Sequence, residues 1–177
     1  MQESRSCKEA MQECIDTGRF AFTQLYSDEK AMNMHIHDCY EIYYAISGGK
    51  QFLIDGNFYD INDGDLFFIN QFESHYLSQV DRAIHERVIM AIHPDYLKQL
   101  SSGSTDLDYC FRARGDGNAN KVHLSEEEQK RFTYFIHKLR KNEGFGEDIL
   151  DQAVFLEFMV FLNKVYRQDR DKEVMGN

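Results

Sequence analysis

The chain has 177 residues, with 20 Lys and Arg against 30 Asp and Glu, and 42% of it is hydrophobic. A chain of this length and composition can bury its own core, which predicts one compact domain or one domain with an appendage. Its net charge of −10 disfavours direct binding to nucleic acid, which needs clustered Lys and Arg. The sequence contains no apolar run of about 18 residues, and its charged N-terminus lacks a signal peptide's apolar stretch. We therefore expect a cytoplasmic protein with no membrane partner.

Residues 1–18 are predicted to form a helical lead-in. Cys7 and Cys14 would lie two turns apart on this helix, about 10 Å along its axis, which is too far for a disulfide. Neither they nor Cys39 and Cys110 form a C-x-x-C pair, so we expect reduced thiols without a zinc site.

Residues 19–124 contain short segments rich in β-branched and aromatic residues with a period of two, which indicates strands. These are Tyr40–Ile46, Gln51–Ile54, Phe58–Ile61, Leu66–Ile69, Tyr76–Val80 and Ile84–Ile92. Glycine and asparagine between them, as in Asp55-Gly56-Asn57, suit tight hairpins. Many short strands at this spacing predict a closed or nearly closed antiparallel barrel or a sandwich.

The pattern changes after Pro94, where a short helix over Asp95–Leu100 and then a loop-rich connector up to Asn120 are predicted. Ser125 and Glu128 have the spacing of a capping box, so a helix should begin there. A second helix is predicted over Glu147–Arg167. Residues 125–177 would therefore form a helical segment.

This second helix is apolar over about half of its circumference, whereas a helix on one core needs about a third. The surplus predicts a homodimer. The side chains expected to face the chain's own core are Leu150, Val154, Phe158, Phe161 and Val165. The predicted contact with a second copy is Phe155, Met159 and Leu162. Ala153, Leu156 and Val160 form a separate apolar cluster on the helical wheel.

The candidate site begins with His35, His37 and Glu41, which project to one face if the segment is extended. Tyr43 shares this parity, and His75 follows a later strand. Two or three imidazoles with one carboxylate suit a divalent transition metal. The group could equally be a hydrogen-bonded cluster that fixes strand geometry, or the polar rim of an effector pocket.

At these residues the sequence resembles the cupin superfamily, whose first motif is matched by His35, His37, Glu41 and Gly48. Gly64 and His75 keep the spacing of the second motif, while Asn70 replaces its proline. Because the second motif is altered, we expect no cofactor. If a divalent transition metal is bound, the resemblance implies that His35, His37, Glu41 and His75 hold it.

A wider resemblance, over about residues 19–168, is to the N-terminal sensing domain of AraC-type transcription regulators. It rests on His-x-His-x2-Tyr-Glu-Ile, a Gly-Asp-Leu-Phe-Phe-Ile strand, Ile-His-Pro-Asp-Tyr-Leu and two following helices. The resemblance implies a mainly β fold with C-terminal α-helices, in which a cupin-type antiparallel β-barrel (a double-stranded β-helix) precedes two helices.

In function, the resemblance implies a non-enzymatic domain that binds a small-molecule effector and dimerises. The ligand-binding residues would be His35, His37, Glu41, Tyr43 and His75. Regulators of this type contact DNA through a separate helix-turn-helix domain, and nothing after Arg170 resembles one. We expect that domain to be absent from this chain.

Two further expectations concern the class of effector and an alternative function. Lys50 and Arg82 are the cations near the predicted site, which favours a neutral hydroxylated effector such as a sugar over a polyanion. The alternative function is a small metal-dependent cupin enzyme, an oxygenase or isomerase, in which the same histidines and Glu41 leave metal positions open for substrate.

Overall fold

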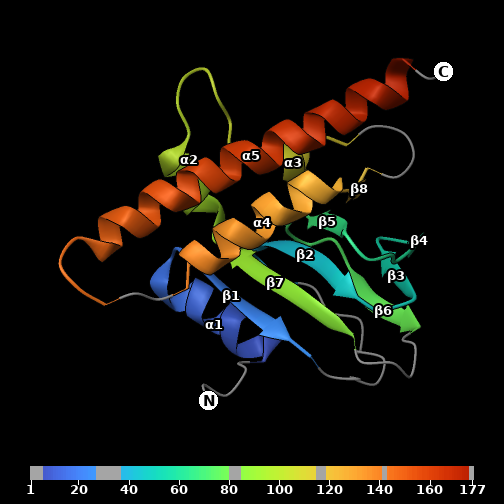
Figure 1. Ribbon diagram of the computed structural model, residues 1–177, viewed down its shortest axis with the longest axis horizontal. Coiled ribbons are helices and arrows are strands. Elements are labelled where there is room, and N and C mark those ends of the chain that lie inside the picture. Colours follow the sequence, from blue (N-terminus) through green and yellow to red (C-terminus); the bar gives the residue numbers. More distant parts are fainter. Residues whose placement is uncertain (1–5, 27–36, 80–84, 115–118, 141–142, 176–177) are drawn as a thin grey trace.

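The computed structural model describes residues 6–26, 37–79, 85–114, 119–140 and 143–175, and they form three layers (Figure 1). A small sheet faces a larger one, and helices cover the outer face of the larger sheet. The strands are β1 (Phe20–Leu25), β2 (Tyr40–Ser47), β3 (Gln51–Ile54), β4 (Asn57–Asp60), β5 (Asp65–Ile69), β6 (His75–Gln79), β7 (Glu86–Ile92) and β8 (Lys121–His123). The helices are α1 (Cys7–Thr17), α2 (Pro94–Leu100), α3 (Tyr109–Arg112), α4 (Glu126–Lys138) and α5 (Glu147–Met175).

All strand pairs in these sheets are antiparallel. The larger sheet has the order β1-β7-β2-β5-β8 and the smaller one the order β4-β3-β6. Within the described residues the hydrogen bonds therefore form two facing sheets rather than one closed barrel. The predicted fold class, mainly β with C-terminal helices, is confirmed.

Strand β2 shows how the larger sheet serves two cores, because alternate side chains leave a strand on opposite faces. Ile42 and Tyr44 pack in the core between the sheet and the helices. Tyr43 and Ala45 pack in the core between the two sheets. Because β2 is covered on both faces, its first six residues are all buried, including the charged Glu41.

Helix α1 lies on the side of the larger sheet away from α4 and α5 (Figure 1). It begins with a capping box between Ser6 and Glu9 and ends at Gly18, whose φ of 63° suits glycine. Ala10 and Cys14 of α1 pack with Ala21 of β1 and other small residues. Small side chains let the helix approach the sheet closely.

Four elements differ from the sequence-based expectation, and one of them is β8, which was not predicted and pairs with β5. Strand β1 was not predicted as a separate strand, and it pairs with β7 at the edge of the larger sheet. The connector expected to be loop-rich contains α3, where Cys110 and Phe111 are buried. Helix α5 continues to Met175 rather than ending at Arg167.

The predicted dimer contact on α5 is wrong. Phe155, Met159 and Leu162 each have an exposed fraction of 0% because α5 packs against α3 and α4 as well as the sheet. These neighbours together bury a larger part of the circumference of α5 than the face of one sheet would. Leu150, assigned to the core from the sequence, is instead 56% exposed.

Among the described residues, no helix combines the length and apolar character that crossing a lipid bilayer would require.

Candidate functional site

Three of the predicted site residues come together at the start of β2 and β6. The Nε2 atom of His37 lies 2.9 Å from Oε2 of Glu41, and Nε2 of His75 lies 3.5 Å from the same oxygen. The side chains of Glu41 and His75 are 2% and 1% exposed, and that of His37 is 9% exposed. His35 lies outside the described residues. The cluster is therefore nearly closed, and His37 is its most exposed member.

The backbone fixes which nitrogen of each imidazole carries a proton. His37 Nδ1 lies 2.9 Å from the Cys39 carbonyl oxygen, and His75 Nδ1 lies 2.8 Å from the Glu73 carbonyl oxygen. A carbonyl oxygen only accepts, so both Nδ1 atoms donate. In the neutral imidazoles the lone pair is then on Nε2, the atom that points to Glu41.

The ionisation of His37 and of Glu41 follows from their contacts. Burial lowers the pKa of His37, but the hydrogen bond to Glu41 and the negative charge of Glu41 outweigh it and raise the pKa overall. Burial opposes ionisation of Glu41, yet the charge of His75 and the hydrogen bond from His37 hold its pKa well below the usual range. Glu41 is therefore a carboxylate at neutral pH, and it favours a positive charge on the groups around it.

The donor set fits a divalent transition metal. One ligand atom from each of His37, Glu41 and His75 lies within 4.8 Å of the others. Histidines that bind metals usually donate their other N–H to a carbonyl or carboxylate, as both do here. A proton on His37 satisfies the same charge requirement, so the arrangement is compatible with a metal without requiring one.

Tyr43 does not join this group. Its ring lies in the core between the sheets against Phe52 and Phe67, and its hydroxyl group is hydrogen-bonded to Nε2 of His85. His85 Nδ1 lies 2.7 Å from the Ser47 carbonyl oxygen, so Nε2 accepts and the tyrosine donates. Tyr43 has the predicted parity, but it lies further along β2 and has a different partner.

Arg87 is a buried cation that the sequence analysis missed. Its side chain is 1% exposed, and it has the parity of Ile89, which packs in the core between the sheets. Its Nη1 donates to the carbonyl of His85 at 3.1 Å. The alternation along β7 could have placed it on this inner face.

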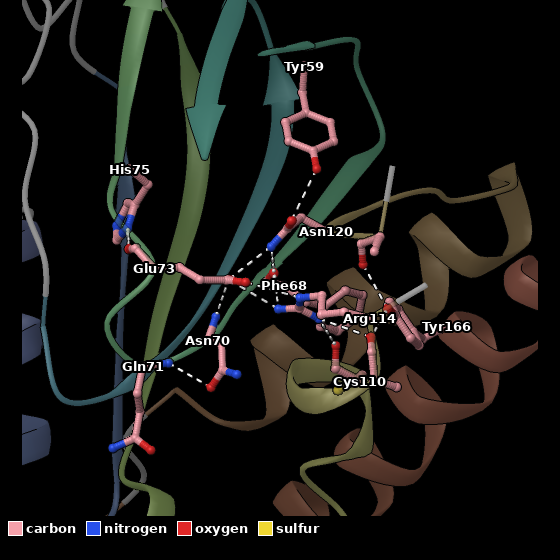
Figure 2. Close-up of polar contacts among 12 residues, drawn as sticks. Tyr59, Phe68, Asn70, Gln71, Glu73, His75, Cys110, Arg114, Asn120 and Tyr166 are labelled. Carbon is pink, nitrogen blue, oxygen red and sulfur yellow. Dashed lines mark hydrogen bonds and ion pairs between the residues drawn. The ribbon is translucent and has the colours of Figure 1, made fainter. Parts of the chain in front are cut away.

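A second polar group, centred on Glu73, joins the site to the helical layer (Figure 2). The Glu73 carboxylate accepts from Nε and Nη2 of Arg114, both at 3.1 Å, and from Nδ2 of Asn120 at 3.0 Å. The Asn70 backbone N–H also donates to it at 2.7 Å. Because the Glu73 carbonyl accepts from His75, this residue connects the candidate site to Arg114.

The same group reaches α5. Arg114 donates to the carbonyls of Phe68 and Cys110. The Tyr166 hydroxyl on α5 contacts the carbonyls of Ala113 and Ala119 (Figure 2). No local pattern in the sequence indicates this network, because Glu73 and Arg114 lie 41 positions apart.

A separate pocket of about 110 Å³ lies between α4 and the outer face of the larger sheet. Val88, Phe132 and Ile136 are among its apolar lining residues, and Gln24 and Arg140 are among the polar ones. It lies on the opposite face of the sheet from Glu41 and is not the site predicted from the sequence.

Comparisons with known proteins agree with this architecture. A family model described as the AraC-like ligand binding domain matches residues 19–159. A search of curated proteins found no match. Among solved structures, ToxT from Vibrio cholerae aligns with a TM-score of 0.55 and 11% identity, covering 85% of this chain and 57% of ToxT. The chain thus spans little more than half the length of ToxT.

A cupin described as RmlC-like, from Shewanella frigidimarina, aligns with a TM-score of 0.36 and 17% identity over 44% of this chain and 71% of its own. At these identities the likeness to solved structures concerns the fold alone.

Proposed function

Since the chain belongs to the family of AraC-like ligand-binding domains, we propose that it is the effector-sensing and dimerisation domain of a cytoplasmic AraC-type transcription regulator and has no catalytic activity. The observation that carries the proposal is the buried His37, Glu41 and His75 cluster on the inner face of a fold of this family. The effector is a small molecule, and DNA is contacted through a domain outside this chain.

The polar groups of the cluster suit a ligand that offers hydroxyl groups. The Glu41 carboxylate accepts hydrogen bonds, and an imidazole Nε2 accepts when neutral and donates when protonated. The apolar residues of the core between the sheets, such as Phe52 and Leu77, would supply the wall that ligand sites usually combine with a few polar anchors. A sugar is the first ligand class to test. Arg87 makes a carboxylic acid the competing one.

A thermal-shift screen distinguishes these classes, because a ligand that binds the native state raises its melting temperature. We expect neutral sugars to give the positive shifts and the Glu41→Gln variant to lose them. The matched control is Glu157→Gln, which changes a 63% exposed carboxylate on α5 and should keep them. If only carboxylic acids raise the melting temperature, the effector is not a sugar.

Helix α5 offers a different dimer contact from the one predicted. Ile149, Ala153, Leu156 and Val160 follow one another at steps of four, three and four residues, which is the spacing of a coiled-coil seam. Ile149 and Val160 are 65% and 37% exposed. A second copy that presents the same stripe would bury it across a two-fold axis, the commonest symmetry among soluble oligomers.

The dimer is tested by light scattering on the purified chain and on an Ile149→Glu, Ala153→Glu double variant. The unmodified chain should be a dimer and the double variant a folded monomer with an unchanged circular-dichroism spectrum. Gln168→Glu, an exposed position on α5 away from the stripe, is the charge control and should remain dimeric. An unmodified chain that is monomeric at micromolar concentration would contradict the proposal.

The contacts of Glu73 support a route by which the two functions are coupled. An effector that moves His75 displaces the carbonyl of Glu73, and with it the Arg114 ion pair that borders α5. The expected result is that a ligand found in the screen changes the dimer dissociation constant of the unmodified chain. The change should be smaller in an Arg114→Lys variant, which keeps the charge but loses the two-point contact.

A metal-binding cupin is the second candidate, because both imidazoles present Nε2 to Glu41 in the way that metal ligands do. A divalent transition metal held by His37, Glu41 and His75 would act as a Lewis acid toward a substrate or effector oxygen. Calorimetric titration with Zn²⁺ tests this. Near-stoichiometric binding that is lost in His37→Ala and kept in the exposed control His137→Ala favours the metal.

A further inference from the structure

Two cysteines that are far apart in the sequence meet beside the candidate site. The sulfur of Cys14, on α1, lies 3.4 Å from that of Cys39, one residue before β2. Their exposed fractions are 0% and 1%. The approach of Cys14 to Cys39 depends on how α1 docks against the sheet, so the spacing of the cysteines in the sequence does not indicate it.

We propose that Cys14 and Cys39 are a modification site, where a mild oxidant such as hydrogen peroxide forms a reversible disulfide that fastens α1 to the start of β2. The sulfur atoms must approach by about 1.4 Å to reach the S–S bond length of about 2.05 Å. The residues that share their cluster are small, namely Ala10, Ala21 and Ala91. The larger side chain packed against this cluster is that of Met11, which is only partly buried and flexible enough to adjust.

The reaction is balanced with peroxide as the oxidant. One cysteine thiolate attacks a peroxide oxygen, so that an S–O bond forms, the O–O bond breaks and hydroxide leaves, which gives a sulfenic acid. The second thiol then attacks this sulfur. The S–S bond forms, the S–O bond breaks, and the oxygen leaves as water with the thiol proton. In total, two thiols lose two electrons and two protons, and one peroxide becomes two waters.

The other cysteines are poorly placed to compete. Cys7 lies two turns from Cys14 on α1, and Cys110 is buried on α3 in the core between the large sheet and the helices. Because the Cys39 carbonyl accepts the Nδ1–H of His37, a bond to Cys39 would also restrain the backbone that orients His37. Oxidation would thus restrain the orientation of His37 without placing a ligand in the candidate site.

The experiment uses the reduced chain, treated with peroxide under native conditions, quenched with acid, denatured and alkylated. We expect two of the four cysteines to resist alkylation and peptide mapping to give one crosslinked species, Cys14 with Cys39. The disulfide closes a loop of 25 residues, so the melting temperature should rise by about 5 °C or more and return after treatment with dithiothreitol.

Two variants keep the test decisive. A Cys7→Ser, Cys110→Ala double variant retains only the proposed pair and should form the same crosslink. Cys39→Ala should form no crosslink and show no rise in melting temperature on oxidation. Four alkylated cysteines, a crosslink through Cys7, or oxidation of Cys39 to a sulfinic acid without a crosslink would each overturn the proposal.

The link to the candidate site is read from His37 by NMR. Its imidazole resonances should differ between the reduced and the disulfide forms and should be unchanged by peroxide in Cys39→Ala. Unchanged resonances in a protein whose crosslink has been mapped would overturn the proposed effect on His37. The proposal that the disulfide forms would still stand. This readout requires no effector, so it remains separate from the test of the proposed function.

Discussion

Arg114 holds Glu73 at two points, with Nε on one carboxylate oxygen and Nη2 on the other, each at 3.1 Å. The two side chains are 23% and 17% exposed, so the pair is partly shielded from water. The charge of Glu73 also keeps the pKa of Arg114 raised even though burial acts in the opposite direction. This pair joins the turn before His75 to the residues that follow α3, where the carbonyl of Ala113 contacts Tyr166 of α5.

Glu73→Gln should destabilise the fold by about 1 to 3 kcal/mol, because it leaves a partly buried guanidinium without its anionic partner. Asp106→Asn is the matched control. It alters the ion pair between Asp106 and Arg112, whose side chains are 64% and 55% exposed, and should cost less than about 0.5 kcal/mol. Urea unfolding of both variants measures the difference. Equal costs would mean that the Glu73 pair is no more than a surface contact.

Met159→Glu and Val160→Glu are neighbouring substitutions with opposite expected results. Met159 is fully buried, so a carboxylate there should cost more than about 3 kcal/mol and abolish cooperative unfolding. Val160 is 37% exposed, and its variant should keep the native circular-dichroism spectrum. A well-folded Met159→Glu protein would show that α5 is rotated from its position in this structure.

Gly49 is predicted to resist substitution more strongly than Gly56. Both have a positive φ, +82° and +85°, so alanine at either position is strained by about 1 kcal/mol. A Cβ at Gly49 would also lie 2.8 Å from Cε1 of the buried His85, whereas a Cβ at Gly56 would have no atom within 4 Å. Thermal unfolding should therefore show that Gly49→Ala loses more stability than Gly56→Ala, by at least about 1 kcal/mol. Equal losses would mean that His85 moves aside freely.

His85 should contribute a loss of stability in mild acid, opposite in sign to the contribution of His37, whose pKa is raised. Burial lowers the pKa of His85, and the nearby Arg87 acts in the same direction, outweighing the Ser47 carbonyl and Asp63. The Tyr43 hydroxyl also faces the ring. A histidine whose folded pKa lies below its unfolded value favours folding when neutral. Its contribution is complete above the unfolded pKa of about 6.5 and is lost as the pH falls through the lower folded value.

The measurement is the free energy of unfolding between pH 7.5 and pH 5. His85→Gln should show a smaller loss of stability over this range than the unmodified chain, and the exposed control His137→Gln should behave like the unmodified chain. An identical pH dependence in His85→Gln would assign the acid sensitivity to other groups.

The parts of this protein that could be predicted from its sequence are those set by local periodicity. An assumed strand alternation put His37 and Glu41 on one face, and motif spacing pointed to His75. The structure brings both histidines to Glu41, although His37 lies before β2, which begins at Tyr40. The alternation could not show that the Tyr43 hydroxyl pairs with His85, since that contact joins β2 to the segment before β7.

The errors arose where tertiary contacts decide the outcome. A helical wheel shows which residues of α5 share a face, but it cannot show how many other elements cover the helix. Met159 was therefore predicted to contact a second copy of the chain, although the chain's own core buries it. The contacts of Glu73 with Arg114 and of Cys14 with Cys39 span 41 and 25 positions. No periodic signal in the sequence indicates contacts between segments so far apart.

The two-sided burial of β2 has a consequence for how such a domain can diversify. Its inward positions carry Glu41 of the candidate site and Tyr43 of the core between the sheets, while Ile42 and Tyr44 support the helical layer. Two interleaved sets of residues therefore serve different tasks within one eight-residue strand. Changes at every second position can alter the face that carries Glu41 while the intervening residues preserve the packing of the helical layer, so the two faces of the sheet can diverge independently along a single stretch of backbone.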